Sequence, residues 1–110
     1  MKSYYVYIVT NKTRTVVYTG ITNHLERRIL EHYLDRGNTK SFAGRYKCHH
    51  VVFFDWFDDI DQAIAFEKRI KGKSRKWKND LIEEHNPDWD SLNHHLFGYW
   101  PPDEALVSFL

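Results

Sequence analysis

The first twenty residues constrain the fold more than any other segment, because two runs of strand-forming residues stand on either side of a short turn-forming run. Aromatic and β-branched side chains fill Tyr4 to Thr10 and return at Thr15 to Thr19, with the polar residues Asn11 to Arg14 between them. Such side chains favour extended strands, and a short polar connection favours antiparallel pairing. This segment therefore predicts a β-hairpin, whose second strand is closed by Gly20.

Apolar side chains at helical spacing follow the hairpin. Thr22 or Asn23 can cap the helix that they predict, and Gly37 is expected to end it. The polar segment from Arg36 to Lys47 is predicted to be a loop. The three apolar positions are Leu25, Ile29 and Tyr33.

The second half of the chain predicts one more strand and two helices. His50 to Phe57 is an apolar run typical of a central strand buried on both faces. An aspartate within residues 58–61 caps the next helix, Gly72 ends it, and Ser74 caps the helix after it. Pro87 stops that last helix, because proline disfavours helical geometry in the residue before it.

The predicted order is strand, strand, helix, strand, helix, helix (β-β-α-β-α-α). We therefore expect an α+β fold with a small, mostly antiparallel three-stranded sheet flanked by helices. A length of 110 residues suits one core, so we expect one domain over residues 1–92. An aromatic-rich tail, 93–110, is expected to pack on that domain.

Composition excludes several classes of protein. With one cysteine, Cys48, the chain forms no internal disulfide and no cysteine-rich zinc site. No apolar run approaches the length of a membrane span, and no leader pattern is present. We therefore expect no membrane contact, and the cytoplasm is the default compartment.

The net charge is only +1, but the basic residues are unevenly distributed. They gather at Lys12 to Lys47 and at Lys68 to Lys78, and the second segment holds no acid. Acids collect instead at Asp55 to Asp61 and from Asp80 onward. This asymmetry can form one positive face on a nearly neutral protein, although such runs are often ordinary solvated helix faces.

Side chains suited to a phosphodiester stand on the hairpin and on the helix after it. Tyr7 and Tyr18 lie on the two strands, and Arg28 and His32 lie one helical turn apart, so they share a face. A guanidinium can form two hydrogen bonds to one phosphate, and an imidazole can transfer a proton near neutral pH. A phosphodiester is an anionic substrate that needs both a charge stabiliser and a proton acceptor.

Glu67 interrupts the apolar stripe of the predicted second helix. It falls between Ile64 and Ile70, on the side expected to face the core. A buried, unpaired carboxylate is costly, so Glu67 needs a partner. It could pair with Lys71 one turn further on, or it could bind Mg²⁺, which keeps most of its water ligands.

At these positions the chain resembles the GIY-YIG nuclease superfamily. The resemblance covers Ser3 to about Leu92, and residues 63–72 and 86–89 look like its compact single-domain bacterial branch. It extends to the nuclease domains of excision-repair endonucleases and of homing endonucleases. The matching positions, in order, are Tyr5-Val6-Tyr7, Tyr18-Thr19-Gly20, Arg28, His32, Glu67 and Asn86.

The resemblance implies a metal-dependent endonuclease that hydrolyses phosphodiester bonds in DNA, structure-selectively or with weak sequence specificity. Tyr7 would orient or deprotonate the attacking water, with Tyr18 in support, and which of them is the base stays open. Arg28 would stabilise charge, His32 would assist, and Glu67 would hold Mg²⁺ or Mn²⁺. A phenol is a poor base at neutral pH unless cations such as Arg28 or the metal lower its pKa. The residues expected to contact nucleic acid are Arg27, Arg45, Lys71, Lys73 and Asn86.

The chain departs from the family pattern at four positions. Tyr5 replaces the first glycine, Val6 and Thr19 replace isoleucines, and Ile21 stands where some relatives have a lysine. The first three are backbone or packing positions, with little chemical consequence expected.

Several candidates also have structural explanations. The two tyrosines could simply pack the sheet, His32 could be a satisfied core residue, and Asn86 could be a helix end. Arg28 could lie on the surface beside Arg27. The adjacent pairs His49-His50 and His94-His95 are expected to point to opposite faces, which makes them poor zinc ligands.

Two other functions compete with the enzyme. One is a nucleic-acid-binding module of the same fold with little or no activity, and the other is an interaction domain whose aromatic tail docks a protein partner. A pure binder needs basic residues but not a buried acid, so Glu67 favours the enzyme.

Overall fold

The computed structural model describes residues 2–102. Its three-stranded antiparallel sheet has β1 (Tyr4–Thr10) at the centre, with β2 (Val17–Thr22) and β3 (His50–Phe57) at the two edges. The predicted α+β class and the hairpin are therefore confirmed. The prediction that His50 to Phe57 is a central strand is wrong, because only its first half is buried and residues 54–56 are exposed.

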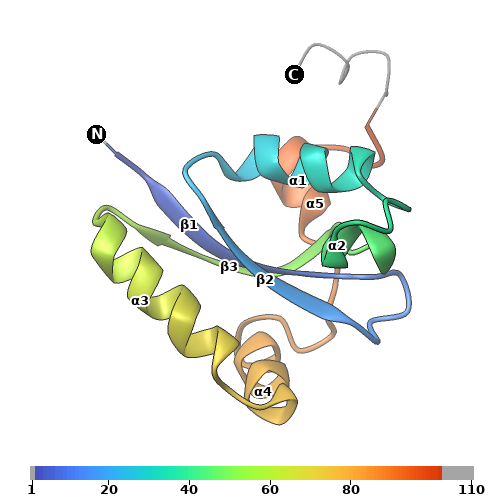
Figure 1. The fold of residues 1–110 in the computed structure, drawn as a ribbon. Helices are drawn as coiled ribbons and strands as arrows, with labels where there is room; N and C mark the ends of the chain where they lie inside the picture. The colour runs from blue at the N-terminus through green and yellow to red at the C-terminus, as the bar shows by residue number, and fades with distance from the viewer. Residues whose placement is uncertain (1, 103–110) are drawn as a thin grey trace.

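The helices form one layer on each face of this sheet (Figure 1). On one face lie α3 (Ile60–Lys71) and α4 (Arg75–His85), and on the other lie α1 (Leu25–Leu34), α2 (Phe42–Arg45) and α5 (Asn93–Phe97). Within residues 2–102, no helix has the length and apolar character needed to cross a bilayer.

Helix ends follow the sequence signals in α3 and α4. Asp59 caps α3 by accepting a hydrogen bond from the Asp61 amide, Gly72 is its C-cap, and Ser74 caps α4. The predicted cap of α1 is wrong. His24, rather than Thr22 or Asn23, accepts the hydrogen bond from the Arg27 amide.

The segment predicted as a loop before β3 contains α2. Ser41 caps it by accepting from the Gly44 amide at 3.0 Å, so a serine in a polar stretch was a helix signal. Gly37 lies beyond the end of α1 with φ +90°, a conformation that favours glycine. Gly20 does not close β2, since the strand continues to Thr22.

Alternate side chains of β1 supply two separate cores. The core beside α3 and α4 consists of Val6, Ile8, Val52, Phe53, Ala63, Ile70 and Ile82, with Trp89 packed against it. The core beside α1 consists of Tyr7, Val9, Leu25, Ile29, Ala43, Cys48 and Val51. Leu92, Leu96, Phe97 and Trp100 pack against this second core. Residues 103–110 of the predicted tail lie outside the described residues.

Candidate active site

The Tyr7 side chain extends towards β2 and passes over Gly20, which has no side chain of its own. Tyr7 pairs with Gly20 across β1 and β2. A Cβ atom at Gly20 would lie 2.4 Å from the Tyr7 hydroxyl oxygen, which is far closer than such contacts allow. Gly20 is therefore needed for close approach and not for a turn, because it leaves room for the phenol at the β2 edge.

The Tyr7 hydroxyl meets His32 of α1 beneath the surface. The distance from the hydroxyl oxygen to His32 Nε2 is 2.8 Å, and the Tyr7 side chain belongs to a residue only 1% exposed. Burial raises the pKa of Tyr7 to about 12, although the charge and hydrogen bond of Arg28 act to lower it. Burial and the charge of Arg28 lower the pKa of His32 to about 4.

These shifts fix the protonation states at neutral pH. Tyr7 is a neutral phenol and His32 a neutral imidazole, and the tautomer of His32 decides which of the two donates the hydrogen bond between them. Arg28 acts to lower the pKa of Tyr7, as expected. The opposite effect of burial is larger, so the pKa is raised overall.

Tyr18 and Arg28 lie next to Tyr7 and His32, and these four side chains form one cluster. The rings of Tyr7 and Tyr18 both lie edge-on to His32, with centroids 5.6 and 5.7 Å away. Burial disfavours the charge of Arg28, but Tyr7 and Glu31 outweigh it and raise the pKa of the guanidinium. Arg28 therefore carries a permanent positive charge next to the Tyr7 hydroxyl.

Glu67 and Lys71 reach the same place from α3, on the other side of the sheet. The Glu67 side chain is 14% exposed, and its carboxylate lies 3.5 Å from Lys71 Nζ. Lys71 Nζ in turn lies 5.8 Å from the centroid of the Tyr18 ring. The negative charge of Glu67 is close enough to act on the pKa of Tyr7. Glu67 thus forms the ion pair with Lys71 that the sequence allowed as an alternative to metal binding. This pair lies beside Tyr18.

The donor set around Glu67 suits a cation with few protein ligands. Across residues 2–102, no three or more His, Cys, Asp or Glu side chains gather closely enough to hold a metal. A zinc site, which needs several such ligands, does not fit. Mg²⁺ retains waters and takes one or two carboxylates together with substrate phosphates, so a single sheltered carboxylate fits it.

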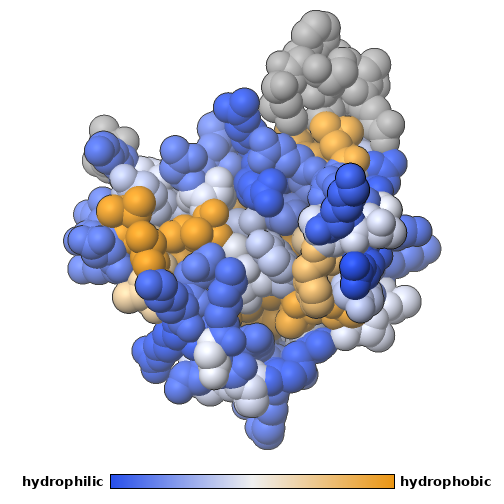
Figure 2. Space-filling model, in the orientation of Figure 1, coloured by the Kyte–Doolittle hydropathy of each residue, from blue (hydrophilic) through white to orange (hydrophobic). Residues whose placement is uncertain are grey.

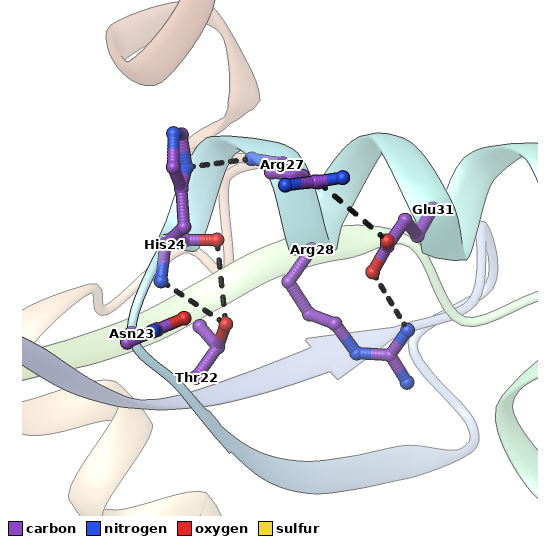
Figure 3. Close-up of a pocket in the computed structure, with 6 residues that line it drawn as sticks. All are labelled: Thr22, Asn23, His24, Arg27, Arg28 and Glu31. Carbon is purple, nitrogen blue, oxygen red and sulfur yellow. Dashed lines mark hydrogen bonds and ion pairs between the residues drawn. The ribbon is translucent and has the colours of Figure 1, made fainter. Parts of the chain in front are cut away.

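Arg28 separates two hollows on the surface. One is a polar pocket at the start of α1, lined by Thr22, Asn23, His24, Arg27, Arg28 and Glu31 (Figure 3). In it both arginines approach Glu31, with Arg28 at 3.2 Å and Arg27 at 4.0 Å. The other is smaller and is lined by Tyr18, Arg28, His32, Asp35, Ser41, Phe42 and Ala43. Arg28 therefore lines both hollows.

The structure does not bring every predicted residue to this cluster. Arg45 is exposed and donates to the Thr39 carbonyl at 3.0 Å, and Lys73 lies over the Trp77 ring at 5.6 Å. Asn86 is buried, and its amide donates to the carbonyls of Val52 at 3.1 Å and Asp90 at 2.9 Å. These contacts give Asn86 the structural role at a helix end that the sequence left open.

The pair His49 and His50 also differs from expectation. Their ring centroids lie 4.3 Å apart instead of on opposite faces. The reason is that His49 precedes β3 and lacks the strand geometry that would separate the two side chains.

Two features of the site escaped sequence reasoning. The role of Gly20 was missed because pairing register cannot be assigned from one strand, although a glycine between strand-forming residues signals close approach. Phe42 was missed because it lay in a segment predicted to be a loop. The signal was the serine cap directly before it.

Comparison with known proteins defines the class. Residues 3–80 match the family described as the GIY-YIG catalytic domain. Since that match covers most of the chain, the protein belongs to the GIY-YIG family, whose domain is of the nuclease type.

Similar proteins carry a narrower family name. A UPF0213 protein of Haloquadratum walsbyi is 38% identical over 81 residues, which cover 74% of this chain and 88% of that protein. Another, from Clostridium perfringens, is 38% identical over 78 residues, covering 71% and 81%. The solution NMR structure of a UPF0213 protein from Bacillus halodurans matches with a TM-score of 0.52 and 27% identity, covering 84% of this chain and 95% of that one.

Proposed function

We propose that this protein is a metal-dependent endonuclease that hydrolyses phosphodiester bonds in DNA. One observation carries the proposal: the Tyr7 hydroxyl lies 2.8 Å from His32 Nε2 and interacts with both Arg28 and the charge of Glu67. A phenol, an imidazole, a guanidinium and a carboxylate then surround one small region at the β2 edge. Membership of a nuclease-type family supports the same chemistry.

The proton that leaves the attacking water would follow the hydrogen bond between Tyr7 and His32, with His32 in the tautomer whose Nε2 accepts. Water hydrogen-bonded to Tyr7 transfers its proton to the phenol oxygen as the phenol passes its own proton to His32 Nε2. The neutral imidazole accepts that proton and becomes imidazolium, so no free phenolate is required. This relay is consistent with a Tyr7 whose pKa is raised rather than lowered.

Charge on the phosphoryl group is stabilised by side chains from both layers. Arg28 presents its guanidinium to the phosphoryl oxygens, where a fixed cation favours the transition state. Glu67 is the residue that would hold one Mg²⁺ or Mn²⁺. When bound, that ion supplies Lewis-acid stabilisation of the departing oxyanion.

Basic residues around this region would hold the nucleic acid. Arg27 lies beside Arg28 in the polar pocket, and Lys71 lies over Tyr18 (Figure 3 shows the two arginines). Arg45 and Lys73 are exposed further out. Phosphate contacts position DNA without reading sequence, so recognition by DNA structure or weak sequence preference is favoured over long-site specificity.

The proposal is tested by incubating the protein with supercoiled plasmid and with branched DNA, with and without Mg²⁺ or Mn²⁺. Nicking should require the metal and should be lost in Glu67→Ala, because the cation's ligand is gone. DNA binding by that variant should stay close to wild type. Glu84→Ala, which removes an exposed carboxylate of α4, is the matched control and should cleave normally.

Two results would overturn this proposal. One is cleavage by Glu67→Ala at the wild-type rate. The other is binding without cleavage by the wild type with either metal, which would favour the nucleic-acid-binding module.

A further inference from the structure

Two aromatic side chains next to the proposed active site are exposed without filling a core. Phe42 is 52% exposed and Tyr46, directly after α2, is 42% exposed. Their rings are tilted by 54° with centroids 5.0 Å apart, and Phe42 stacks with Tyr18 at 6.3 Å and an interplanar angle of 29°. Tyr18, Phe42 and Tyr46 thus form a continuous aromatic column that begins at the active-site cluster and extends outwards.

The column is held in place by the tight packing of α2. Ser41 caps this helix and donates to the Asp35 carboxylate at 2.8 Å. A Cβ atom at Gly44 would lie 2.5 Å from the Ser41 hydroxyl and 2.7 Å from the backbone oxygen of Asp35, so α2 sits closely against the end of α1. Phe42 is therefore presented at a fixed position, although a ring exposed to water gains little stability there.

Cationic side chains stand beside the aromatic column. Phe42 and Arg28 line the same small hollow as Tyr18 and His32. Lys71 Nζ lies over the Tyr18 ring, and Arg45 stands in α2 between Phe42 and Tyr46. Hydrophobic side chains reach the surface over α2 and are bordered by hydrophilic ones (Figure 2). Aromatic faces flanked by cations match the bases and phosphates of a nucleic acid strand.

We propose that Phe42 and Tyr46 stack with an unpaired base of the substrate, so that the preferred DNA is single-stranded or locally unpaired next to the cleaved bond. This inference rests on the proposed function, because it assigns the substrate class of the same site. Aromatic side chains stack on any base whose face is accessible. In a duplex each base face is already covered by its neighbours, so only an unpaired base can use the column.

The test measures binding to two fluorescein-labelled DNAs by fluorescence anisotropy, in EDTA so that no cleavage occurs. The probes are a single-stranded oligothymidylate and a duplex of the same length. In the double variant Phe42→Ala/Tyr46→Ala, affinity for the single strand should fall by about tenfold or more, while affinity for the duplex changes by less than about twofold. Phe42→Tyr/Tyr46→Phe keeps both rings and should restore single-strand binding, which separates stacking from any effect on folding.

Trp56→Ala is the matched control. Trp56 is 45% exposed, but it lies on β3 at the opposite edge of the sheet. It should leave both affinities unchanged. An equal loss on single strand and duplex, or the same loss in Trp56→Ala, would overturn the proposal. Wild-type affinity of the double variant for both DNAs would also overturn the proposal. The exposed rings would then be explained better as a contact for a protein partner.

The two proposals fail in distinguishable ways. If the double variant binds single strands normally while the wild type cleaves DNA and Glu67→Ala does not, only the stacking proposal fails. If single-strand binding depends on the column but the wild type cleaves no DNA with Mg²⁺ or Mn²⁺, only the endonuclease proposal fails.

Discussion

The two faces of the sheet use the same central strand for different purposes. Val6 and Ile8 point to the α3 and α4 side, where they join a core of apolar side chains. Tyr7 points to the α1 side, where a buried phenol and a buried imidazole are hydrogen-bonded. One face is therefore mainly an apolar core, and the other holds most of the groups of the candidate active site. They meet at the β2 edge, which Glu67 and Lys71 reach from α3.

Arg28→Ala should show the largest effect that leaves the fold intact. Removing a charge that stabilises the transition state should lower the cleavage rate by about two or more orders of magnitude. Arg27→Ala is the neighbouring control, because Arg27 also approaches Glu31 but is exposed. Single-turnover rates of plasmid nicking measure the effects of both substitutions. Equal losses in the two variants would mean that the arginines act only by attracting DNA.

Ile82→Ala should lower the stability of the protein and leave its cleavage rate unchanged. Ile82 is fully buried in the core beside α4, and truncating such a side chain typically costs about 2–5 kcal/mol of unfolding free energy. Urea denaturation gives that free energy, and cleavage assayed in the cold gives the rate of the molecules that stay folded. That rate should match the wild type. A lowered rate in fully folded protein would show that the two faces are not separable.

The pH dependence of stability should come from the α1 side alone. Burial lowers the pKa of His32 and of His49 to about 4, so between there and the ordinary value near 6.5 the unfolded chain binds more protons than the folded one. Stability is therefore complete above that window and falls as the pH drops through it. For His32 alone, the loss between pH 7.5 and 5.5 should be about 1 kcal/mol.

Urea denaturation across this pH range checks that prediction. His32→Gln should reduce the dependence by about half, since His49 has a similar shift, whereas His85→Gln, a change of an exposed histidine of α4 on the other face, should leave it unchanged. A slope that is the same in His32→Gln as in the wild type would assign the titration to other groups.

Local signals in the sequence predicted local structure well. Asp59, Gly72 and Ser74 cap their helices as expected, because capping depends on a few neighbouring residues. Strand order depends on the whole chain, and the apolar run of β3 was therefore mistaken for a central strand. His24 was not recognised as a cap because its imidazole rarely takes that role.

Three members of the candidate site were predictable from the sequence, but the electrostatics of the site were not. Spacing identified Tyr7, Arg28 and His32, and the structure places them together. The pKa values follow from burial, which a sequence does not specify. Burial leaves Tyr7 protonated and His32 neutral, and the proposed proton route depends on the hydrogen bond between them.

The most direct measurement compares Tyr7→Phe with Tyr4→Phe, two changes that each remove one oxygen atom from the same strand. Tyr4 packs against the apolar core beside α3 and α4, and Tyr7 meets His32 on the other face. With Mg²⁺ and a common DNA substrate, Tyr7→Phe should cleave at least about a hundredfold more slowly, while losing about 1–3 kcal/mol of stability because His32 Nε2 loses its buried hydrogen-bond partner. Tyr4→Phe should cleave like the wild type. Wild-type cleavage by Tyr7→Phe would contradict a catalytic centre at the β2 edge.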